Sequence, residues 1–331
     1  MKSLRSLALA ATAVAALGAV SPAQAALTAF QTFVGKYGVS TDGWGSTTQR
    51  GVISASVPVG ATVVGAYLYT STFSNPTLSG VGGTLNGNAL SYTNMGVVAD
   101  SCCDLAAGRM DVTSIIKPLV DGGPGGIYNF NITETNSTQD GSALVVVYQL
   151  NSLAVSTVGI LDGFSATGGD ATAINFSQPL DKTAPGFFAE MRLGIGFSCC
   201  NQQSTISVNG TVITNTSGNN DDSADPSLGN GNLITVGGYD DAFSPMLPGY
   251  TADTERYNLV PQINNGDTSI AIRTSNPSRN DNIFLAVFHV AGEAGVNTPP
   301  PTNRVPEPGS LALVGLALLG LGAKQRRNAR K

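Results

Sequence analysis

The sequence predicts an all-β protein made of antiparallel, jelly-roll-like sandwiches. Apolar and polar residues alternate with a period of two in "IYNFNIT", residues 127–133, which is typical of a half-buried strand. Apolar runs at residues 143–150 and 283–290 are short and rich in β-branched and aromatic residues, as central strands are. Only 12% of residues are charged and 40 are glycines, a composition typical of secreted, turn-rich β proteins.

The first element, residues 1–25, has the features of a secretory signal peptide. A basic start with Lys2 and Arg5 precedes a long Ala/Leu/Val run that ends in the small-residue triplet "AQA". This pattern predicts cleavage after Ala25. The rest of the chain is therefore expected outside the cytoplasm.

The next element, residues 26–150, is predicted to be the first β-sandwich module. Its strongest turn signal is Asn86-Gly87, because both residues tolerate positive φ in a tight hairpin. The segment "DVTSIIKPLV" is the best candidate for a short helix, with Asp111 or Thr113 placed to cap it.

Residues 151–293 repeat the same pieces in the same order and are predicted to be a second module. The second hairpin, Asn209-Gly210, follows the first by 123 residues, whereas the final strands are 140 residues apart. A longer second loop, residues 215–232, accounts for the difference. This pattern favours a diverged tandem duplication. The alternative is that strands and turns common to all β-sheet proteins happen to recur in the same order.

Four cysteines form two adjacent pairs, Cys102-Cys103 and Cys199-Cys200. In an oxidising compartment they are disulfide candidates, and four cysteines allow three pairings. Disulfides within each pair would close strained rings, whereas disulfides between the two pairs would cross-link distant parts of the chain. The second arrangement is favoured, and a reduced metal site is the alternative.

Residues 294–304 are predicted to be a Pro-rich, extended linker, and residues 305–331 a tail. The tail has an apolar run at residues 310–323, followed by a cluster of Lys and Arg. A helix of this length spans ~21 Å, less than the ~30 Å hydrocarbon core of a membrane. With its basic end it predicts a short transmembrane helix whose terminus lies in the cytoplasm.

The tail resembles the PEP-CTERM sorting signal. The resemblance rests on Val305, Pro306, Glu307 and Pro308, on the short apolar helix, and on Arg326 and Arg327 near the end. It implies that an exosortase cuts the chain near the Pro-Glu-Pro motif, after the helix has held it transiently in the inner membrane. It also implies a Gram-negative host that makes exopolysaccharide. The body itself resembles secreted β-sandwich surface proteins of uncharacterised function.

The charge of the body excludes one class of partner. The chain has 22 acidic and 17 basic residues, but seven of the basic ones lie at its two ends, Lys2, Arg5, Lys324, Arg326, Arg327, Arg330 and Lys331. Residues 26–308 therefore carry 10 basic and 22 acidic residues, a net charge of −12. Such a surface repels phosphate backbones, so nucleic acid is not expected as a partner.

The inventory of catalytic residues is small, and no enzyme activity or resident cofactor is predicted. His289, the one histidine, lies in a predicted strand where a packed core histidine is favoured over a catalytic one. Acidic loop residues Asp221, Asp222 and Asp225 are candidate calcium ligands, because calcium takes several oxygen ligands from flexible loops. Asp240 and Asp241 form a second cluster. Ordinary solvated acidic loops are the favoured explanation, because acid clusters are common on loops.

These features together predict an exported, non-enzymatic protein of the cell surface or extracellular matrix. The expected role is structural or adhesive and linked to exopolysaccharide, biofilm or floc formation. The alternative is a carbohydrate-binding, lectin-like module, in which Trp44 could stack on a glycan with help from Tyr37, Tyr239 and Tyr250. The favoured interpretation of Trp44 is nevertheless that it only caps the core.

Overall fold

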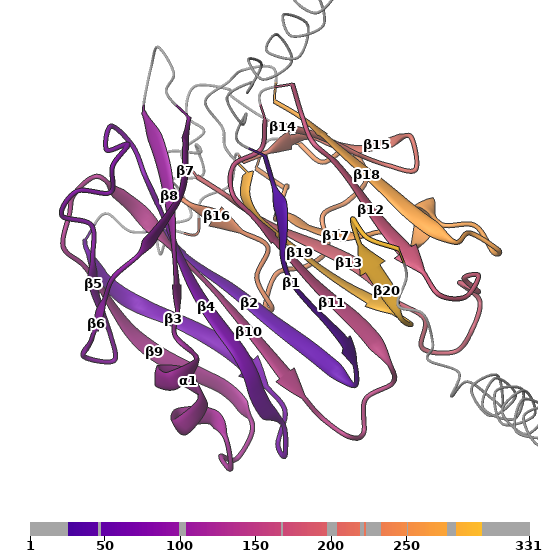
Figure 1. Cartoon of the computed structure of the whole chain (residues 1–331), viewed down its shortest axis with the longest axis horizontal. Helices are drawn as coiled ribbons and strands as arrows, with labels where there is room; N and C mark the ends of the chain where they lie inside the picture. Colours follow the sequence, from indigo (N-terminus) through magenta and orange to yellow (C-terminus); the bar gives the residue numbers. More distant parts are fainter. Residues whose placement is uncertain are drawn as a thin grey trace, which may run out of the picture.

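The computed structural model describes residues 26–45, 48–98, 104–166, 168–196, 204–218, 222, 233–249, 251–276 and 283–299. Every strand pairing among them is antiparallel. The strands form four sheets, and the helical elements described are α1 (Thr113–Val120) and the short 3-10 helix η2 (Val260–Gln262) (Figure 1). The prediction of an all-β, antiparallel protein is confirmed.

The first half of the chain supplies two sheets that pack face to face. Inner sheet 1 has the order β2 (Tyr37–Gly45), β10 (Gln139–Gln149), β4 (Thr62–Thr72), β8 (Leu105–Asp111) and β7 (Thr93–Val98). Outer sheet 1 has the order β3 (Arg50–Val57), β9 (Gly126–Glu134), β5 (Gly83–Leu85) and β6 (Asn88–Leu90).

The second half supplies the other two sheets. Inner sheet 2 has the order β1 (Thr28–Gly35), β11 (Ser156–Asp162), β19 (Ile283–Ala291), β13 (Ala189–Ile195) and β16 (Thr235–Val236), and β17 (Arg256–Asn258) also pairs with β13. Outer sheet 2 has the order β15 (Thr211–Ser217), β14 (Ser204–Val208), β18 (Ser269–Ser275), β12 (Ala171–Phe176) and β20 (Ala294–Val296).

The two halves share one strand order. The run β2-β10-β4-β8 in the first half corresponds to β11-β19-β13-β16 in the second, and β3-β9-β5-β6 corresponds to β12-β18-β14-β15. Helix α1 and helix η2 occupy equivalent places between these strands. Strand β1 departs from this division, because it precedes the first half in sequence but pairs with β11 of the second.

The two Asn-Gly hairpins show the same correspondence in their contacts. The Asn86 side-chain oxygen accepts the Asn131 N–H at 2.7 Å, and the Asn86 N–H donates to the Asn131 carbonyl at 2.8 Å. Asn209 makes the same two bonds with Ala271, at 2.9 and 2.8 Å. Both asparagines have positive φ, as the sequence predicted for tight hairpins. The strand order and these contacts support the interpretation of a tandem repeat.

Three apolar cores hold the four sheets together as successive layers. One core lies between outer sheet 1 and inner sheet 1, and another between inner sheet 2 and outer sheet 2. A third joins the two inner sheets. In β10, Leu144 and Val146 belong to the first core, whereas Val145 and Val147 belong to the third. This double burial explains the continuous apolar run at residues 143–150.

The predicted short helix is present as α1. The Asp111 side chain accepts the Thr113 N–H at 2.9 Å at its start, and Ile116 and Val120 are buried against the first core. None of the helices in the described residues is long and apolar enough to span a membrane. The predicted signal peptide, residues 1–25, and the predicted transmembrane helix of the tail lie outside the described residues. The division into domains 26–150 and 151–293 stays a prediction.

Candidate functional site

A polar row crosses one end of inner sheet 2. His289 of β19, Glu190 of β13 and Asn258 of β17 lie opposite one another across the three strands. They line a pocket of about 490 Å³, a volume within the range of small-ligand sites. The rest of the lining is apolar: Phe187, Phe188, Ala189, Phe243 and Val260.

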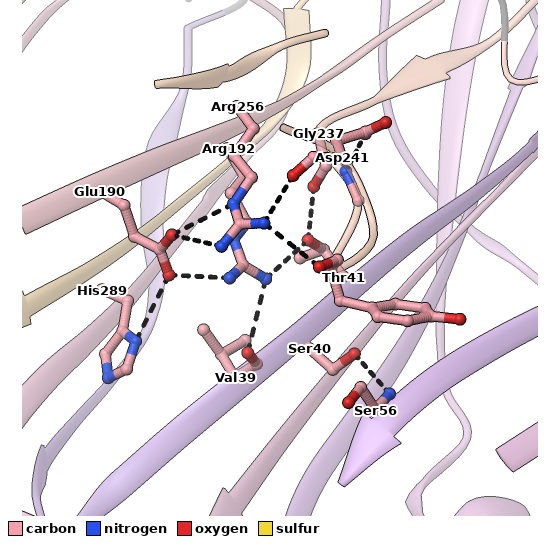
Figure 2. Close-up of polar contacts among 12 residues, drawn as sticks. Val39, Ser40, Thr41, Ser56, Glu190, Arg192, Gly237, Asp241, Arg256 and His289 are labelled. Carbon is pink, nitrogen blue, oxygen red and sulfur yellow. Dashed lines mark hydrogen bonds and ion pairs between the residues drawn. The ribbon is translucent and has the colours of Figure 1, made fainter. Parts of the chain in front are cut away.

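Glu190, one of the residues that line this pocket, is the centre of an ion network, whose contacts are drawn in Figure 2. Its Oε1 accepts a hydrogen bond from Arg192 Nη2 at 2.7 Å and lies 3.6 Å from His289 Nδ1. Its Oε2 accepts from Arg256 Nη2 at 3.2 Å and from Arg256 Nε at 3.3 Å. Both carboxylate oxygens are thus occupied by partners from the protein itself.

The surroundings of Glu190 keep it ionised. Burial alone would raise its pKa, but the nearby His289 ring and the charges of Arg192 and Arg256 outweigh burial and lower the pKa to about 2. Burial also lowers the pKa of the Arg192 guanidinium, against the opposing charge of Glu190. A carboxylate held in this way stays ionised at neutral pH, which makes it a poor general acid.

Arg192 carries the network across to the first half of the chain. Its Nη1 donates to the Thr41 hydroxyl at 3.0 Å and approaches the Val39 carbonyl at 3.4 Å, both in β2 (Figure 2). The Thr41 hydroxyl in turn donates to the Gly237 carbonyl at 2.5 Å. The network therefore ties inner sheet 1 to inner sheet 2 at the edge of their shared core.

His289 is a packed strand histidine, as the sequence suggested. It is half-buried in β19, and its ring centroid lies 4.5 Å from that of Phe188. Its Nδ1 faces Glu190, and its Nε2 lies 3.2 Å from the Tyr37 carbonyl and 3.3 Å from the Ser156 hydroxyl. Both ring nitrogens thus have protein partners.

Phe243, one of the residues that line the pocket, packs against Arg256. The Arg256 guanidinium carbon lies 4.6 Å from the centroid of the Phe243 ring, within the range of cation–π contacts. Arg256 Nη1 donates to the Asp241 carbonyl at 2.7 Å and so holds the loop before β17 against the sheet. Phe243 is still 45% exposed, which leaves part of its ring open to a ligand.

Asp222, one of the predicted calcium ligands, lies in a crowded acidic region against β2. Its N–H donates to the Ile234 carbonyl at 3.0 Å, and its carbonyl accepts the Gly45 N–H at 2.6 Å. Burial, then the charges of Asp241 and Asp42, raise the pKa of Asp222 far above its usual value. Burial raises the pKa of Asp42 to about 7, with further contributions from nearby acidic residues.

The described residues were compared with the requirements of a metal centre. Within the parts of the chain that it describes, no group of three or more His, Cys, Asp or Glu residues could hold a metal ion. The other two candidate ligands, Asp221 and Asp225, lie outside the described residues. Calcium binding therefore stays a prediction from the sequence.

Trp44 is a core residue that leaves little of its side chain exposed to solvent. The residue is 8% exposed and belongs to the core between the sheets of the first half. Its indole lies so close to Gly51 that a Cβ there would come within 2.0 Å of Nε1. This position fits a tryptophan that caps the core, the interpretation that the sequence favoured, and a role in glycan stacking stays a prediction. Tyr37 and Tyr239 are half-buried, and Tyr250 lies outside the described residues.

Several other predicted site residues also lie outside the described residues. They are the four disulfide candidates Cys102, Cys103, Cys199 and Cys200, the cleavage site after Ala25, and the sorting residues Val305, Pro306, Glu307, Pro308, Arg326 and Arg327.

Sequence reasoning missed the network of Glu190, Arg192 and Arg256. A signal for it was present in "AEMRLGI", where Glu190 and Arg192 are two residues apart and therefore share one face of a strand. Met191 and Leu193 occupy the other face and enter the apolar core. Two opposite charges on one face of an otherwise apolar strand predict a buried ion pair.

Comparisons with known proteins were made for the whole chain. A search among curated proteins found no match. Among solved structures, a beta-porphyranase of glycoside hydrolase family 86 from the human gut bacterium Bacteroides plebeius is similar with 9% sequence identity and a TM-score of 0.21. The similarity covers 83% of this chain but 37% of that chain, and at this TM-score it supports no conclusion.

The tail gives the one firm assignment. Residues 304–327 match the PEP-CTERM protein-sorting motif, as the resemblance in the sequence indicated. This motif is a substrate signal for an exosortase. The chain therefore carries a PEP-CTERM sorting signal, which implies export and a C-terminal membrane anchor before processing.

Proposed function

We propose that the chain is an exported, non-enzymatic protein of the cell surface or extracellular matrix, delivered there through its sorting signal. The observation that carries the proposal is the PEP-CTERM motif at residues 304–327, which follows the folded body. An exosortase of a Gram-negative host would cut near residues 305–308 and release two jelly-roll-like modules. These modules would act in a structural or adhesive role with exopolysaccharide, in biofilm or floc formation.

The body supports a non-catalytic role. Glu190 and His289 line the aromatic pocket, but their polar atoms already contact other protein groups. Three apolar cores make the four sheets one thick stack, which suits a load-bearing surface component. The net charge of −12 over residues 26–308 favours hydration and opposes binding to anionic surfaces.

The sorting step can be tested by replacing Pro306 and Glu307 with alanine in the native host. The processing enzyme should no longer release the protein, so it should remain in the membrane fraction. Arg330→Ala, which lies outside the matched residues 304–327, is the control and should be released normally. Equal release of both variants would contradict the proposal.

The adhesive part needs a separate experiment. Deletion of residues 26–293, with the leader and the tail retained, should weaken attachment or flocculation of the host and change the retention of exopolysaccharide. A strain that attaches, flocculates and retains its matrix as before would contradict the adhesive role while leaving sorting intact.

The aromatic pocket favours a second candidate function, carbohydrate binding. Phe187, Phe188 and Phe243 offer ring faces to sugar C–H groups, and Asn258 adds an amide beside them. Phe243→Ala should abolish binding to any glycan that an array identifies. Leu119→Ala is a matched control, because Leu119 is 48% exposed on α1 while Phe243 is 45% exposed. Binding that survives Phe243→Ala would remove this pocket as the site.

A further inference from the structure

A second pocket, the polar pocket, lies on the solvent face of outer sheet 2. Its volume is about 350 Å³, within the range of small-ligand sites, and its described lining shares no residue with that of the aromatic pocket. Ala171 of β12, Arg273 of β18, Ser207 of β14 and Val212 of β15 pair in turn across the four strands. All four residues of this row line the pocket.

The alternation of the strands places polar groups on this face. Ile206 and Ile272, each next to a residue of the row, are buried in the core between inner sheet 2 and outer sheet 2. Thr205 and Ser275 form a further cross-strand pair and add two more hydroxyls to the lining. A guanidinium and three hydroxyls therefore gather on one small area of the sheet.

These polar groups are not used by the protein itself. In the part of the chain that the structure describes, the Arg273 guanidinium makes no hydrogen bond or ion pair, and the hydroxyls of Thr205, Ser207 and Ser275 make no hydrogen bond. Water must satisfy them when the pocket is open. A ligand with several hydroxyl groups can replace that water without loss of hydrogen bonds.

The loop at residues 168–170 also lines the pocket, and it is fixed to β18. Gly169 has positive φ, and a Cβ there would come within 1.9 Å of the Thr274 carbonyl oxygen. The Asp170 N–H donates to the Thr274 hydroxyl at 2.8 Å, and the Thr274 N–H donates to the Asp170 carbonyl at 3.0 Å. The sheet therefore sets the position of Asp170.

Asp170 and Arg273 bring opposite charges to one pocket without pairing. No salt bridge between described residues joins them. Asp170 Oδ2 accepts the Ala166 N–H at 3.0 Å, which leaves Oδ1 as an acceptor. The pocket thus offers a guanidinium that only donates, a carboxylate that only accepts and hydroxyls that do both. Neighbouring hydroxyl groups of a sugar, each a donor and an acceptor, match this set.

The charge of the surroundings favours a neutral sugar. Residues 26–308 have a net charge of −12, and Asp170 lies in the lining, so a polysaccharide rich in carboxylates is repelled. An amino sugar with a positive charge would meet the Arg273 guanidinium in the same pocket.

We propose that the polar pocket binds neutral sugar units of an exopolysaccharide. Arg273 donates to adjacent sugar oxygens, Asp170 accepts from a sugar hydroxyl, and Ser207 does either. Val212, which is 41% exposed, packs against sugar C–H groups. This site deepens the first proposed function, on which it rests for exopolysaccharide as the source of the sugar. The aromatic pocket, which belongs to the second candidate function, is the rival location.

The first half of the chain provides a matched control. The equivalent contacts of Asn131 and Ala271 make Thr133 the counterpart of Arg273, two residues further on. The Thr133 hydroxyl bonds to that of its neighbour on β5 at 2.9 Å, so it is already used. The arginine of this row, Arg50, is exposed and lies opposite Thr133 on the edge strand β3. Arg50→Gln therefore removes the same charge from the equivalent row of the other half.

Affinity electrophoresis of the mature protein from its native host tests the proposal. Native gels contain exopolysaccharide of that host, separated by anion exchange into a neutral and an acidic fraction. The neutral fraction should retard the wild type, and the acidic fraction should not. Arg273→Gln should bind the neutral fraction about ten- to hundredfold more weakly, because hydrogen bonds to a charged group are lost. Arg50→Gln should bind as the wild type does.

Three outcomes would overturn the proposal. The first is a wild type that the neutral fraction does not retard or that the acidic fraction retards more. The second is normal binding by Arg273→Gln, which should fold normally because Arg273 is exposed. The third is loss of binding in Phe243→Ala, which would place the sugar in the aromatic pocket. Poor attachment of a strain that lacks residues 26–293 would still support the first proposed function in each case.

Discussion

Replacement of Glu190 by glutamine should destabilise the protein strongly at neutral pH. Glutamine resembles a protonated Glu190, so the cost follows from the lowered pKa of this carboxyl. A fall from 4.5 to about 2, at 1.36 kcal/mol per unit, corresponds to about 3 kcal/mol. This agrees with the 3–5 kcal/mol that is typical when one partner of a buried ion pair is removed. Arg192, whose side chain is 6% exposed, is the charge left behind.

The contribution of Glu190 to the free energy of unfolding should also depend on pH. Because the folded pKa is depressed, the stabilisation by Glu190 is fully present above pH 4.5 and is lost as the pH falls through about 2. Urea unfolding of the wild type and of Glu190→Gln should therefore differ by about 3 kcal/mol at pH 7 and converge near pH 2.

A matched control separates the cost of breaking a buried ion pair from the cost of removing a negative charge in general. Asp121→Asn breaks the pair with Lys117, whose side chains are 27% and 43% exposed, and should cost less than about 1 kcal/mol. A Glu190→Gln variant as stable as Asp121→Asn at pH 7 would refute the account of a buried network that joins the two inner sheets.

Three further outcomes can be measured by thermal or urea unfolding. Burial raises the pKa of Asp42 from 3.8 to about 7, so the stability of the wild type falls as the pH rises through this range. Asp42→Asn removes the buried charge and should therefore stabilise the protein at pH 8. The expected gain is about 1–2 kcal/mol after allowance for the partial exposure of the side chain. No difference between Asp42→Asn and the wild type at pH 8 would contradict this. Trp44→Ala should cost about 3–5 kcal/mol through an empty core site, whereas an unchanged stability would mean that Trp44 is not packed. Asn86→Ala and Asn209→Ala should each cost about 1–2 kcal/mol, because each loses a side-chain hydrogen bond and a tolerated positive φ. Clearly unequal costs would argue against equivalent hairpins.

The fold class could be predicted because its signals are local. Alternation in residues 127–133, the run at 143–150 and the two Asn-Gly turns each report on a few neighbouring residues, and the strands and hairpins formed where they pointed. The pairing of β1 with β11 could not be predicted in this way. This pairing depends on which strand forms a free sheet edge in the complete fold. Local sequence patterns do not report on that edge.

The candidate site was less predictable because it is made by distant segments. His289 and Glu190 are 99 residues apart and meet only because β19 pairs with β13. Trp44 was ambiguous for a related reason, since a tryptophan beside glycines suits a binding loop as well as a core. Gly51, on the neighbouring β3, provides the space that buries it.

The intact mass of the protein from its native host is the most direct test of the sorting signal. The mature chain should begin at Ala26 and end near residues 305–308, with the apolar run and the basic end removed. A mass that retains every residue through Lys331 would contradict it.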